Sequence, residues 1–358
     1  MSTNAVPKQL LSKLLRRMSQ VIPNSSPKEV LTKIKLVFTG DVIRLYGTDL
    51  EQFLIVSALC QTDEPGMALV PYADFRSMFS KLTGDEISLS LEGGIVRIGD
   101  NNCTFELPSH TNMEEYPAFS EFETVHKFAL PVRTLCHCFG QLVHCTDKES
   151  TRYALNAIHV VGSHGGVEMH ASDGRRVALL TVPDTECQDF TALVPAPVAR
   201  SMHVIIDGES CDCEVRIGES SVGIETINMS YSCRQLEGRF PNTTTFKSAL
   251  KSLQWNTVDA NQIRALATQA MAATTREERG IVMEFNGETL HARSQTTKAK
   301  FDSRIKCEGP NCGSITINCE YLHDAVAECE NLKIGIAGDM LGIERDNLAS
   351  ELIMGMGK

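Results

Sequence analysis

The chain has 358 residues, of which 42% are hydrophobic and 22% charged, and its formal net charge is -11. One ordinary hydrophobic core does not support this length, so we expect two or three domains. The acidic surplus excludes a protein that coats nucleic acid with its whole surface, but it allows a local basic face.

The cysteines and the start of the chain indicate the compartment. The cysteines number 13, which is odd, and Met1 to Leu10 contain no apolar core of a secretory leader. Reduced thiols are therefore expected rather than a disulfide framework. No apolar run approaches the roughly 20 residues of a membrane-spanning helix. We expect a cytoplasmic protein without a membrane partner.

The first predicted element is an amphipathic helix from Lys8 to Ile22. Its apolar residues recur at helical spacing, and Lys13, Arg16 and Arg17 lie among the remaining positions without any acid. Such a cationic face fits either plain solvation or contact with a polyanion.

Strand and helix patterns then alternate. Period-two patterns predict strands from Ile34 to Leu59, a helix follows from Tyr72 to Leu82, and strands resume from Ile87 to Leu107. The order is helix, strands, helix, strands.

That order recurs further along the chain. Val70-Pro71 and Val194-Pro195 both precede a predicted helix, and the two prolines are offset by 195 − 71 = 124 residues. Asp49 and Asp173 lie in predicted turns with the same offset, 173 − 49 = 124. Two landmarks in one register indicate an internal repeat.

A third copy is fainter. Ser294-Gln295 corresponds to the second turn, since 295 − 173 = 122. Amphipathic helices open the second and third copies, at Val132 to Cys145 and at Asp259 to Met271. We therefore predict an α+β protein of three repeated domains, 1–123, 124–250 and 251–358, each with two helices against antiparallel sheets. The opening helices avoid acid, which favours a shared surface that faces a polyanion.

Several short motifs resemble those of one family, the bacterial DNA polymerase III sliding clamp, or beta subunit. They span all three copies in the family's order. The matching stretches are Gly47-Thr48-Asp49-Leu50-Glu51, Glu64-Pro65-Gly66 with Val70-Pro71, Arg152-Tyr153-Ala154-Leu155-Asn156, Ala171-Ser172-Asp173-Gly174-Arg175-Arg176, Gly238-Arg239-Phe240-Pro241 and Met354-Gly355-Met356.

The resemblance implies a DNA clamp fold and a head-to-tail homodimer. Six domains would form a ring around double-stranded DNA and act as a processivity factor in DNA replication. A sliding protein contacts phosphates without recognising bases, so its DNA binding is sequence-independent. The residues that we expect to face DNA are Lys13, Arg16, Arg17, Arg133, Lys148, Arg152, Tyr153 and Arg264.

The resemblance also implies a pocket for short peptides of the polymerase III alpha subunit, the clamp loader and other clamp-motif proteins. Its methionines suit varied partners because the side chain is flexible and polarizable. The expected pocket residues are Leu155, Ser172, Gly174, Arg175, Arg176, Val177, Pro241, Leu352, Met354 and Met356.

The chain departs from the family at three places. Gly355 replaces the usual proline of the tail, which predicts a looser wall. Tyr72-Ala73 and Ala196-Pro197 occupy positions that are often basic in the family. The expected dimer interface joins Phe105 and Leu107 to Ala272 and Ala273, whose small side chains predict a weaker joint.

An enzyme is the first alternative. Cys136-His137-Cys138 with His144-Cys145 suggests zinc, but adjacent residues on a helix point about 100° apart and do not easily share one ion. The chain also lacks a Gly-x-Ser-x-Gly elbow, a phosphate-binding glycine loop and a His-Glu-x-x-His motif. We therefore predict no catalytic residue, no metal and no cofactor. The second alternative is a monomeric peptide-binding platform without ring closure.

Overall fold

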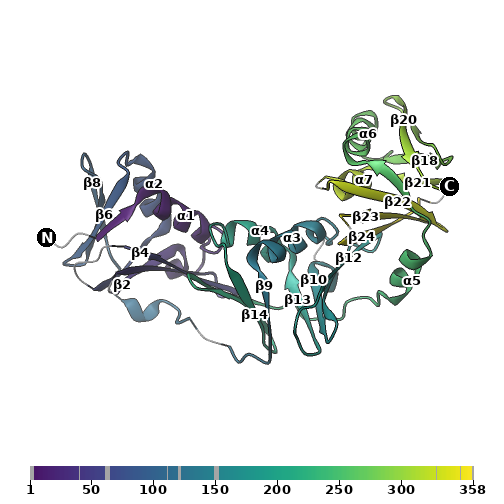
Figure 1. Cartoon of the computed structure of the whole chain (residues 1–358). Helices are drawn as coiled ribbons and strands as arrows, with labels where there is room; N and C mark the ends of the chain where they lie inside the picture. Colours follow the sequence, from purple (N-terminus) through teal and green to yellow (C-terminus); the bar gives the residue numbers. More distant parts are fainter. Residues whose placement is uncertain are drawn as a thin grey trace. The chain divides into compact units, whose positions relative to one another are not determined.

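The computed structural model describes residues 4–39, 41–60, 65–110, 112–119, 122–148, 153–327, 329–346 and 348–356 (Figure 1). One order of elements occurs three times: a strand, a helix, four strands, a second helix and three strands.

The first copy of this order spans Asn4 to Pro108. Its elements are β1 (Asn4–Pro7), α1 (Lys8–Met18), β2 (Lys33–Thr39), β3 (Val42–Thr48), β4 (Gln52–Leu59), β5 (Gly66–Pro71), α2 (Tyr72–Lys81), β6 (Glu86–Glu92), β7 (Ile95–Gly99) and β8 (Thr104–Pro108).

The second copy spans His126 to Arg234. Its elements are β9 (His126–Pro131), α3 (Val132–Val143), β10 (Ala157–Ser163), β11 (Gly166–Ser172), β12 (Arg176–Pro183), β13 (Phe190–Pro195), α4 (Ala196–Ile205), β14 (Asp212–Ile217), β15 (Ser221–Thr226) and β16 (Met229–Arg234).

The third copy spans Asn256 to Met354, after an additional helix, α5 (Thr244–Ser252). Its elements are β17 (Asn256–Asp259), α6 (Ala260–Ala273), β18 (Gly280–Phe285), β19 (Thr289–Gln295), β20 (Lys300–Glu308), β21 (Gly313–Asn318), α7 (Cys319–Ala325), β22 (Asn331–Ala337), β23 (Met340–Arg345) and β24 (Ala349–Met354). The predicted α+β class with repeated helices and antiparallel strands is confirmed.

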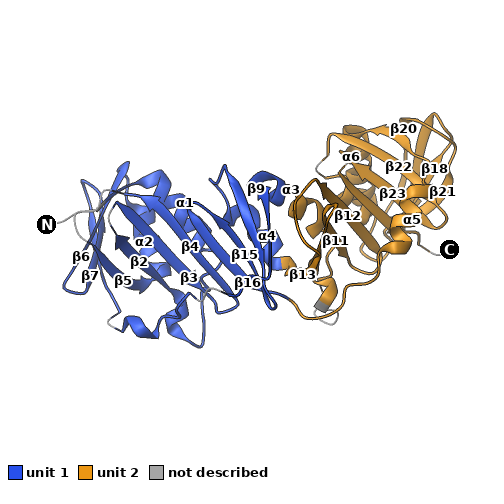
Figure 2. Cartoon of the chain, turned by 60° about the horizontal axis from the view of Figure 1, so that its bottom comes forward, with its two compact units in different colours: residues 1–136, 197–235 blue, residues 137–196, 236–358 orange. Residues whose placement is uncertain are grey.

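The chain forms two compact units, residues 1–136 with 197–235 and residues 137–196 with 236–358 (Figure 2). The first unit contains the sheets β1-β6-β7-β8 and β5-β2-β3-β4-β16-β15-β14-β9. The second contains the sheet β13-β10-β11-β12-β24-β23-β22-β17-β20-β19-β18-β21. The division passes through the second copy because β16 pairs with β4 and β12 pairs with β24. Domain limits near residues 123 and 250 stay a prediction.

Strand pairing joins neighbouring copies twice in the same register. In the first unit, Gln52 lies opposite Cys233, and in the second unit Arg176 lies opposite Ile353. The offsets are 176 − 52 = 124 and 353 − 233 = 120, and the pairs Val56 with Met229 and Leu180 with Ala349 repeat them. The fourth strand of one copy therefore pairs with the last strand of the next by a conserved geometry.

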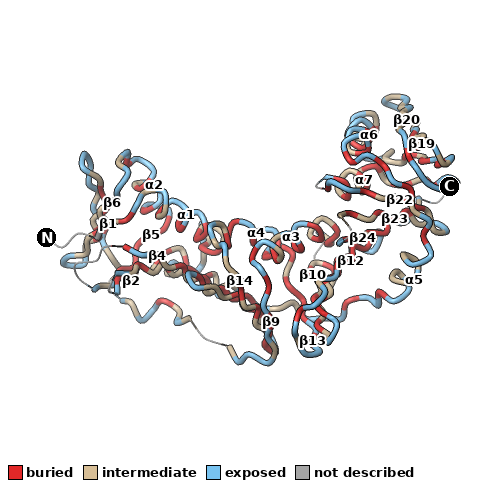
Figure 3. The backbone as a smooth tube through the Cα atoms, viewed as in Figure 1, coloured by how far each residue is buried: buried red, intermediate tan, exposed pale blue. Residues whose placement is uncertain are grey.

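The helices form because their apolar residues share one side. In α1, Leu11, Leu14, Leu15 and Met18 are buried. This helix packs on β3 and β4, whereas α2 packs on β2 and β5. Figure 3 shows the buried residues concentrated along the sides of the helices that face strands. In the described part of the chain, no helix has the length and apolar character required to span a membrane.

The predicted turns at Asp49 and Asp173 are confirmed, and they have the same hydrogen bonds. The Oδ1 atom of Asp49 accepts hydrogen bonds from the backbone N–H groups two and three residues later, at 2.9 and 2.6 Å. Asp173 does the same at 2.9 and 3.1 Å. Each turn contains a residue with positive φ, Leu50 at 79° and Gly174 at 86°. In the third copy Thr296, not the predicted Gln295, accepts the equivalent bonds through Oγ1.

Candidate functional site

Acidic residues are absent from five helices. The sequences of α1, α3, α4, α5 and α6 contain no Asp or Glu, in a chain with a net charge of -11. Because the acids are concentrated elsewhere, these helices present a neutral or basic surface.

Four of the residues predicted to face DNA are exposed: Lys13, Arg16, Arg133 and Lys148. The Arg16 guanidinium lies 3.4 Å from the carboxylate of Asp207, but 60% of its side chain stays exposed. A solvated ion pair of this kind contributes little stability, so Arg16 can exchange this partner for a phosphate.

Two other predicted DNA contacts have different surroundings. Arg17 is 4% exposed, and its guanidinium lies 3.0 Å from Glu209. Burial lowers the pKa of Arg17, and the facing carboxylate opposes this effect. The guanidinium of Arg264 donates to the carbonyl oxygens of Val326 and Cys329 at 3.2 and 2.8 Å. Both guanidinium groups are paired with groups of the protein itself, so Arg17 and Arg264 do not belong to the DNA-facing set. Arg152 and the side chain of Tyr153 lie outside the described residues.

The predicted peptide site joins two distant segments as neighbouring strands. Val177 on β12 lies opposite Leu352 on β24, and the N–H of Met354 donates to the carbonyl of Arg175 at 2.9 Å. Arg175 and Met354 are exposed. The structure therefore brings the turn after β11 and the C-terminal tail together.

The apolar floor of this site is covered by α5. Val177 and Leu352 are 2% and 1% exposed and belong to one cluster of buried side chains, which partly buried residues surround. The other members of the cluster are Leu179, Leu253, Phe246, Ala249, Leu250, Trp255, Ala337 and Met340. The residues of α5 were missed in the sequence, although Phe246, Leu250 and Leu253 recur at helical spacing.

A second apolar cluster contains Leu155 and Phe240, next to the exposed Pro241. The ring of His159 stacks on Phe240 with centroids 4.9 Å apart, and His170 lies beside both. Burial, together with nearby cations, lowers the pKa of His170 to about 4. Because His170 is also the cross-strand partner of Leu179, these two histidines connect the two clusters.

Arg176 does not line the predicted pocket. It is 5% exposed, and its guanidinium binds Asp173 at 3.0 Å, Asp324 at 3.1 Å and the His144 carbonyl at 2.6 Å. Because its guanidinium donates to Asp173, Asp324 and the His144 carbonyl, Arg176 stabilises the start of β12, and each guanidinium nitrogen is already engaged within the protein. Ser172 is also buried, and its hydroxyl donates to the Arg176 carbonyl at 2.8 Å.

The tail is held more firmly than Gly355 led us to predict. The backbone N–H of Gly355 donates to the Asp339 carbonyl at 2.6 Å, and the N–H of Met356 donates to the Thr316 carbonyl at 2.7 Å. A Cβ atom on residue 355 would lie 2.8 Å from the Asp339 oxygen. Glycine therefore permits a close backbone contact, and the prediction of a looser wall is wrong.

The predicted dimer residues lie at the end of one sheet and the end of one helix. Phe105 on β8 is half-buried, whereas Leu107 is 3% exposed within its own copy. Ala272 is exposed and Ala273 half-buried, at the end of α6. Of these residues, Phe105 and Ala272 have the most surface for a partner.

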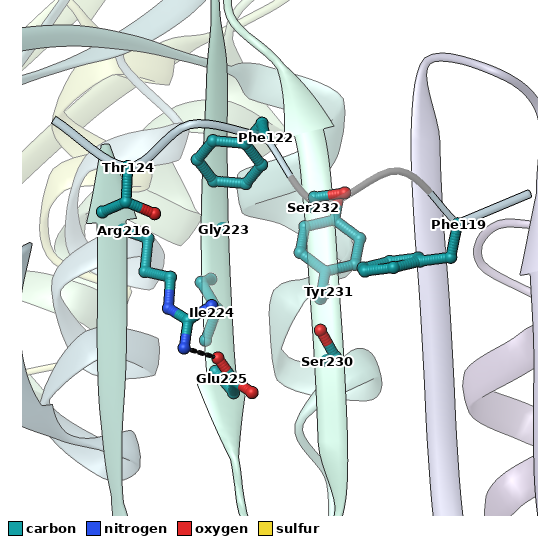
Figure 4. Close-up of a pocket in the computed structure, with 10 residues that line it drawn as sticks. All are labelled: Phe119, Phe122, Thr124, Arg216, Gly223, Ile224, Glu225, Ser230, Tyr231 and Ser232. Atoms are coloured by element: carbon teal, nitrogen blue, oxygen red, sulfur yellow. Dashed lines mark ion pairs between the residues drawn. The ribbon is translucent and has the colours of Figure 1, made fainter. Parts of the chain in front are cut away.

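A small cavity lies in the first unit, away from the predicted sites. Its volume is about 130 Å3, and the close-up in Figure 4 shows the rings of Phe119, Phe122 and Tyr231 around it. Arg216 at this cavity is paired with Glu225. The Tyr231 hydroxyl donates to Gln52 at 2.8 Å, and burial raises its pKa well above the ordinary value. This lining contains no arrangement of nucleophile and base.

The cysteines are free thiols. Burial raises the pKa of Cys136 to about 11 and that of Cys138 to about 12, so both thiols are unreactive at neutral pH. Among the described residues, one group of three side chains is close enough to hold a metal ion, and it consists of His144, Cys145 and Glu351.

Comparison with known proteins identifies the family. The family model for the N-terminal domain of the DNA polymerase III beta subunit matches residues 4–120, and the model for its central domain matches residues 129–242. This chain belongs to the DNA polymerase III beta subunit family. The members of this family are sliding clamps, which are processivity factors and not enzymes.

Individual sliding clamps support this assignment. The beta sliding clamp of Chlamydia muridarum is 21% identical over 290 residues, which are 80% of this chain and 79% of that protein. The crystal structure of the Bacillus subtilis sliding clamp superposes with a TM-score of 0.87 at 18% identity, covering 100% of this chain and 99% of that one. The Streptococcus pyogenes beta subunit has a TM-score of 0.89 at 17% identity, covering 99% and 100%. The fold is that of a sliding clamp.

Proposed function

We propose that this protein encircles duplex DNA as a ring-shaped homodimer and tethers the replicative DNA polymerase for processive synthesis. The observation that carries the proposal is the repeated junction between copies. Twice in the chain, the fourth strand of one copy pairs with the last strand of the next in one register.

At each end of the chain, one strand that corresponds to half of this junction has an edge without the equivalent partner strand in the described residues. The last strand of the first copy is β8, which ends its sheet. The fourth strand of the third copy is β20, which pairs with β19 along one side, whereas on its other side, within the described chain, only Cys307 and Glu308 pair with β17. A second molecule supplies the missing partner for each edge, so head-to-tail pairing of two chains closes a ring of six copies.

The exposed cations on α1 and α3, and Lys148 in the loop after α3, supply the DNA contacts. Lys13, Arg16, Arg133 and Lys148 are long, solvated side chains that bind phosphates without fixing a base sequence. Arg152 and Tyr153 complete the proposed set from the sequence resemblance. Diffuse contacts of this kind allow a ring to slide.

The surface formed by Arg175, Pro241, Met354 and Met356 is the proposed docking site for clamp-motif peptides. The two methionines are 44% and 43% exposed; Met354 pairs with Met340 of the apolar cluster under α5, and Met356 lies beside Gly280 and Thr316. An adaptable apolar surface with polar neighbours suits several partners, namely the polymerase III alpha subunit, the clamp loader and repair proteins.

Retention on circular DNA tests the encircling function. Once loaded onto a closed circular duplex, the protein should remain bound, and it should be lost when the circle is cut. Binding without a loader should be weak and should fall steeply with salt, because it depends on phosphate contacts. Retention on linear DNA with free ends would contradict sliding.

A monomeric peptide-binding platform is the second candidate. The small Ala272 and Ala273 and the buried Leu107 favour it, because they leave little apolar area for a joint. A single-chain mass at micromolar concentration, together with intact peptide binding, would support this alternative.

A further inference from the structure

His144 and Cys145 meet a carboxylate from the other end of the chain. Both follow the last residue of α3, in the turn after the helix, and the Cys145 Sγ lies 3.3 Å from the His144 Nε2. The Glu351 Oε2 lies 2.8 Å from the same nitrogen, although it is 207 residues away in sequence. The three potential ligand atoms lie within 4.8 Å of one another.

The two inner members of this group are buried. Glu351 is 0% exposed, and its Oε1 has no hydrogen-bond partner in the described structure. Burial by itself raises the pKa of Glu351, but the facing His144 and Arg345 outweigh it and hold the pKa at about 2. Burial also raises the pKa of the Cys145 thiol well above its ordinary value. The group therefore brings a buried carboxylate, with one oxygen unpartnered in the described structure, beside a buried thiol.

We propose that His144, Cys145 and Glu351 form a binding site for a divalent ion of the zinc class. Imidazole, thiolate and carboxylate are the ligands that zinc accepts, and tetrahedral coordination separates such atoms by roughly 3.3–3.6 Å. The observed Sγ to Nε2 distance of 3.3 Å has to open by about 0.2 Å to reach the roughly 3.5 Å of a sulfur and nitrogen pair. The Nε2 to Oε2 distance has to open by about 0.5 Å for the same geometry.

Binding balances charge and protons within the site. Bonds form from the ion to Sγ, Nε2 and Oε2, the thiol proton leaves to solvent, and His144 binds through an unprotonated Nε2 with its proton on Nδ1. The two positive charges of the ion then face one thiolate and one carboxylate, and this carboxylate is shared with Arg345. Arg345 and Arg176 also face this site, and Arg176 is itself paired with Asp173 and Asp324.

The turn after α3 explains why the sequence pattern alone argued against metal. Adjacent side chains diverge on a helix, but His144 and Cys145 lie beyond its end and converge on one point. The third ligand lies on β24, directly before Leu352. An ion here would join the end of α3 to the strand that leads into the tail. The site does not depend on the proposed clamp function.

Cobalt provides a direct probe, since it substitutes for zinc and gives a thiolate charge-transfer band. The reduced, chelator-treated full-length protein should bind one Co2+ per chain with such a band in the near ultraviolet, and Zn2+ should displace it. Cys145→Ser should abolish the band and weaken affinity by at least about 10–100-fold, the usual cost of losing even an outer-shell partner.

Cys136→Ser is the control, because Cys136 lies on α3, directly before the turn that carries His144 and Cys145, but does not belong to the group. It should keep the band and the affinity. If Cys145→Ser does not fold, His144→Gln provides the second test and should keep the thiolate band with weakened affinity. The absence of a band in the wild type, or a band that survives Cys145→Ser, would overturn the proposal.

Discussion

At the scale of single residues, Glu351 illustrates how a buried charge is tolerated. Its carboxylate faces His144 at 2.8 Å and Arg345 at 3.4 Å, and Arg345 also donates to the carbonyl of Gln141 at 3.0 Å. These contacts connect β23 and β24 to α3. Removing one partner of such a network leaves an uncompensated buried charge, which is more costly than the net value of the intact pair.

Glu351→Gln should destabilise the protein by about 3–5 kcal/mol at pH 7, because Arg345 loses its buried counter-charge. The pKa of Glu351 is depressed in the folded state to about 2, so the stability from its ionised form is present above the unfolded value and is lost as pH falls from about 4.5 to about 2. Urea unfolding at several pH values measures this: the difference between wild type and variant should shrink over that interval.

The control for this pH dependence is Glu278→Gln. Glu278 is half-buried at the surface, and hydrogen bonds from the hydroxyl and backbone N–H of Thr297 lower its pKa. Its substitution should change stability far less. An equal effect of the two substitutions would show that burial is not the cause.

Some residue roles could be predicted from the sequence, and others depended on distant partners. Asp49 and Asp173 were assigned to repeated turns because their contacts are local. Arg17 was misplaced because its partner, Glu209, lies 192 residues away, and helical spacing cannot reveal such a pairing. Arg176 was wrongly assigned to the pocket for the same reason, because its partner Asp324 lies 148 residues away in sequence.

At the scale of elements, the C-terminal strand and tail show how backbone contacts decide position. Met354, Gly355 and Met356 donate successive hydrogen bonds to three different segments. A proline at residue 355 lacks the N–H and places carbon atoms against the Asp339 oxygen. Gly355, which predicted a looser tail, is the residue that permits the close contact with the Asp339 carbonyl.

Gly355→Pro should therefore release the tail. Amide exchange at Met354 and Met356 should become faster, and stability should fall by about 1 kcal/mol for the lost hydrogen bond. Gly355→Ala keeps the donor and should have a smaller effect. Unchanged exchange in the proline variant would show that the Asp339 contact does not hold the tail.

The two exposed methionines should dominate peptide docking. Met354→Ala combined with Met356→Ala should abolish binding of a polymerase-type peptide, measured by fluorescence polarisation, and leave the mass in solution unchanged. Met67→Ala is the control, because Met67 is 49% exposed on β5 in the other unit. Full peptide affinity in the double variant would exclude the proposed docking surface.

At the scale of the whole molecule, the order of elements was predictable and the pairing between copies was not. Hydrophobic periodicity and the offset of 124 residues identified the repeats, since both depend on local pattern. The pairing of β4 with β16 and of β12 with β24 depends on backbone edges, which the sequence does not distinguish. The additional helix α5 was missed because it belongs to no repeat.

Sedimentation should detect a mass of about twice 39.4 kDa that dissociates on dilution. Phe105→Asp should shift the equilibrium towards the single chain, because it places a charge in the proposed joint beside β20. Ile227→Asp is the matched control, since Ile227 is 87% exposed and lies outside that edge. A wild-type protein that stays monomeric would remove the ring and leave the peptide platform.

The repeated junction also has a consequence for assembly errors. Its register is set by backbone pairing that is the same at both junctions. The pairing by itself therefore does not limit the number of copies that can join. Only the rotation between successive copies determines whether the last edge returns to the first. A substitution that alters this rotation without weakening the pairing would convert closed rings into open filaments, which lengthen with protein concentration.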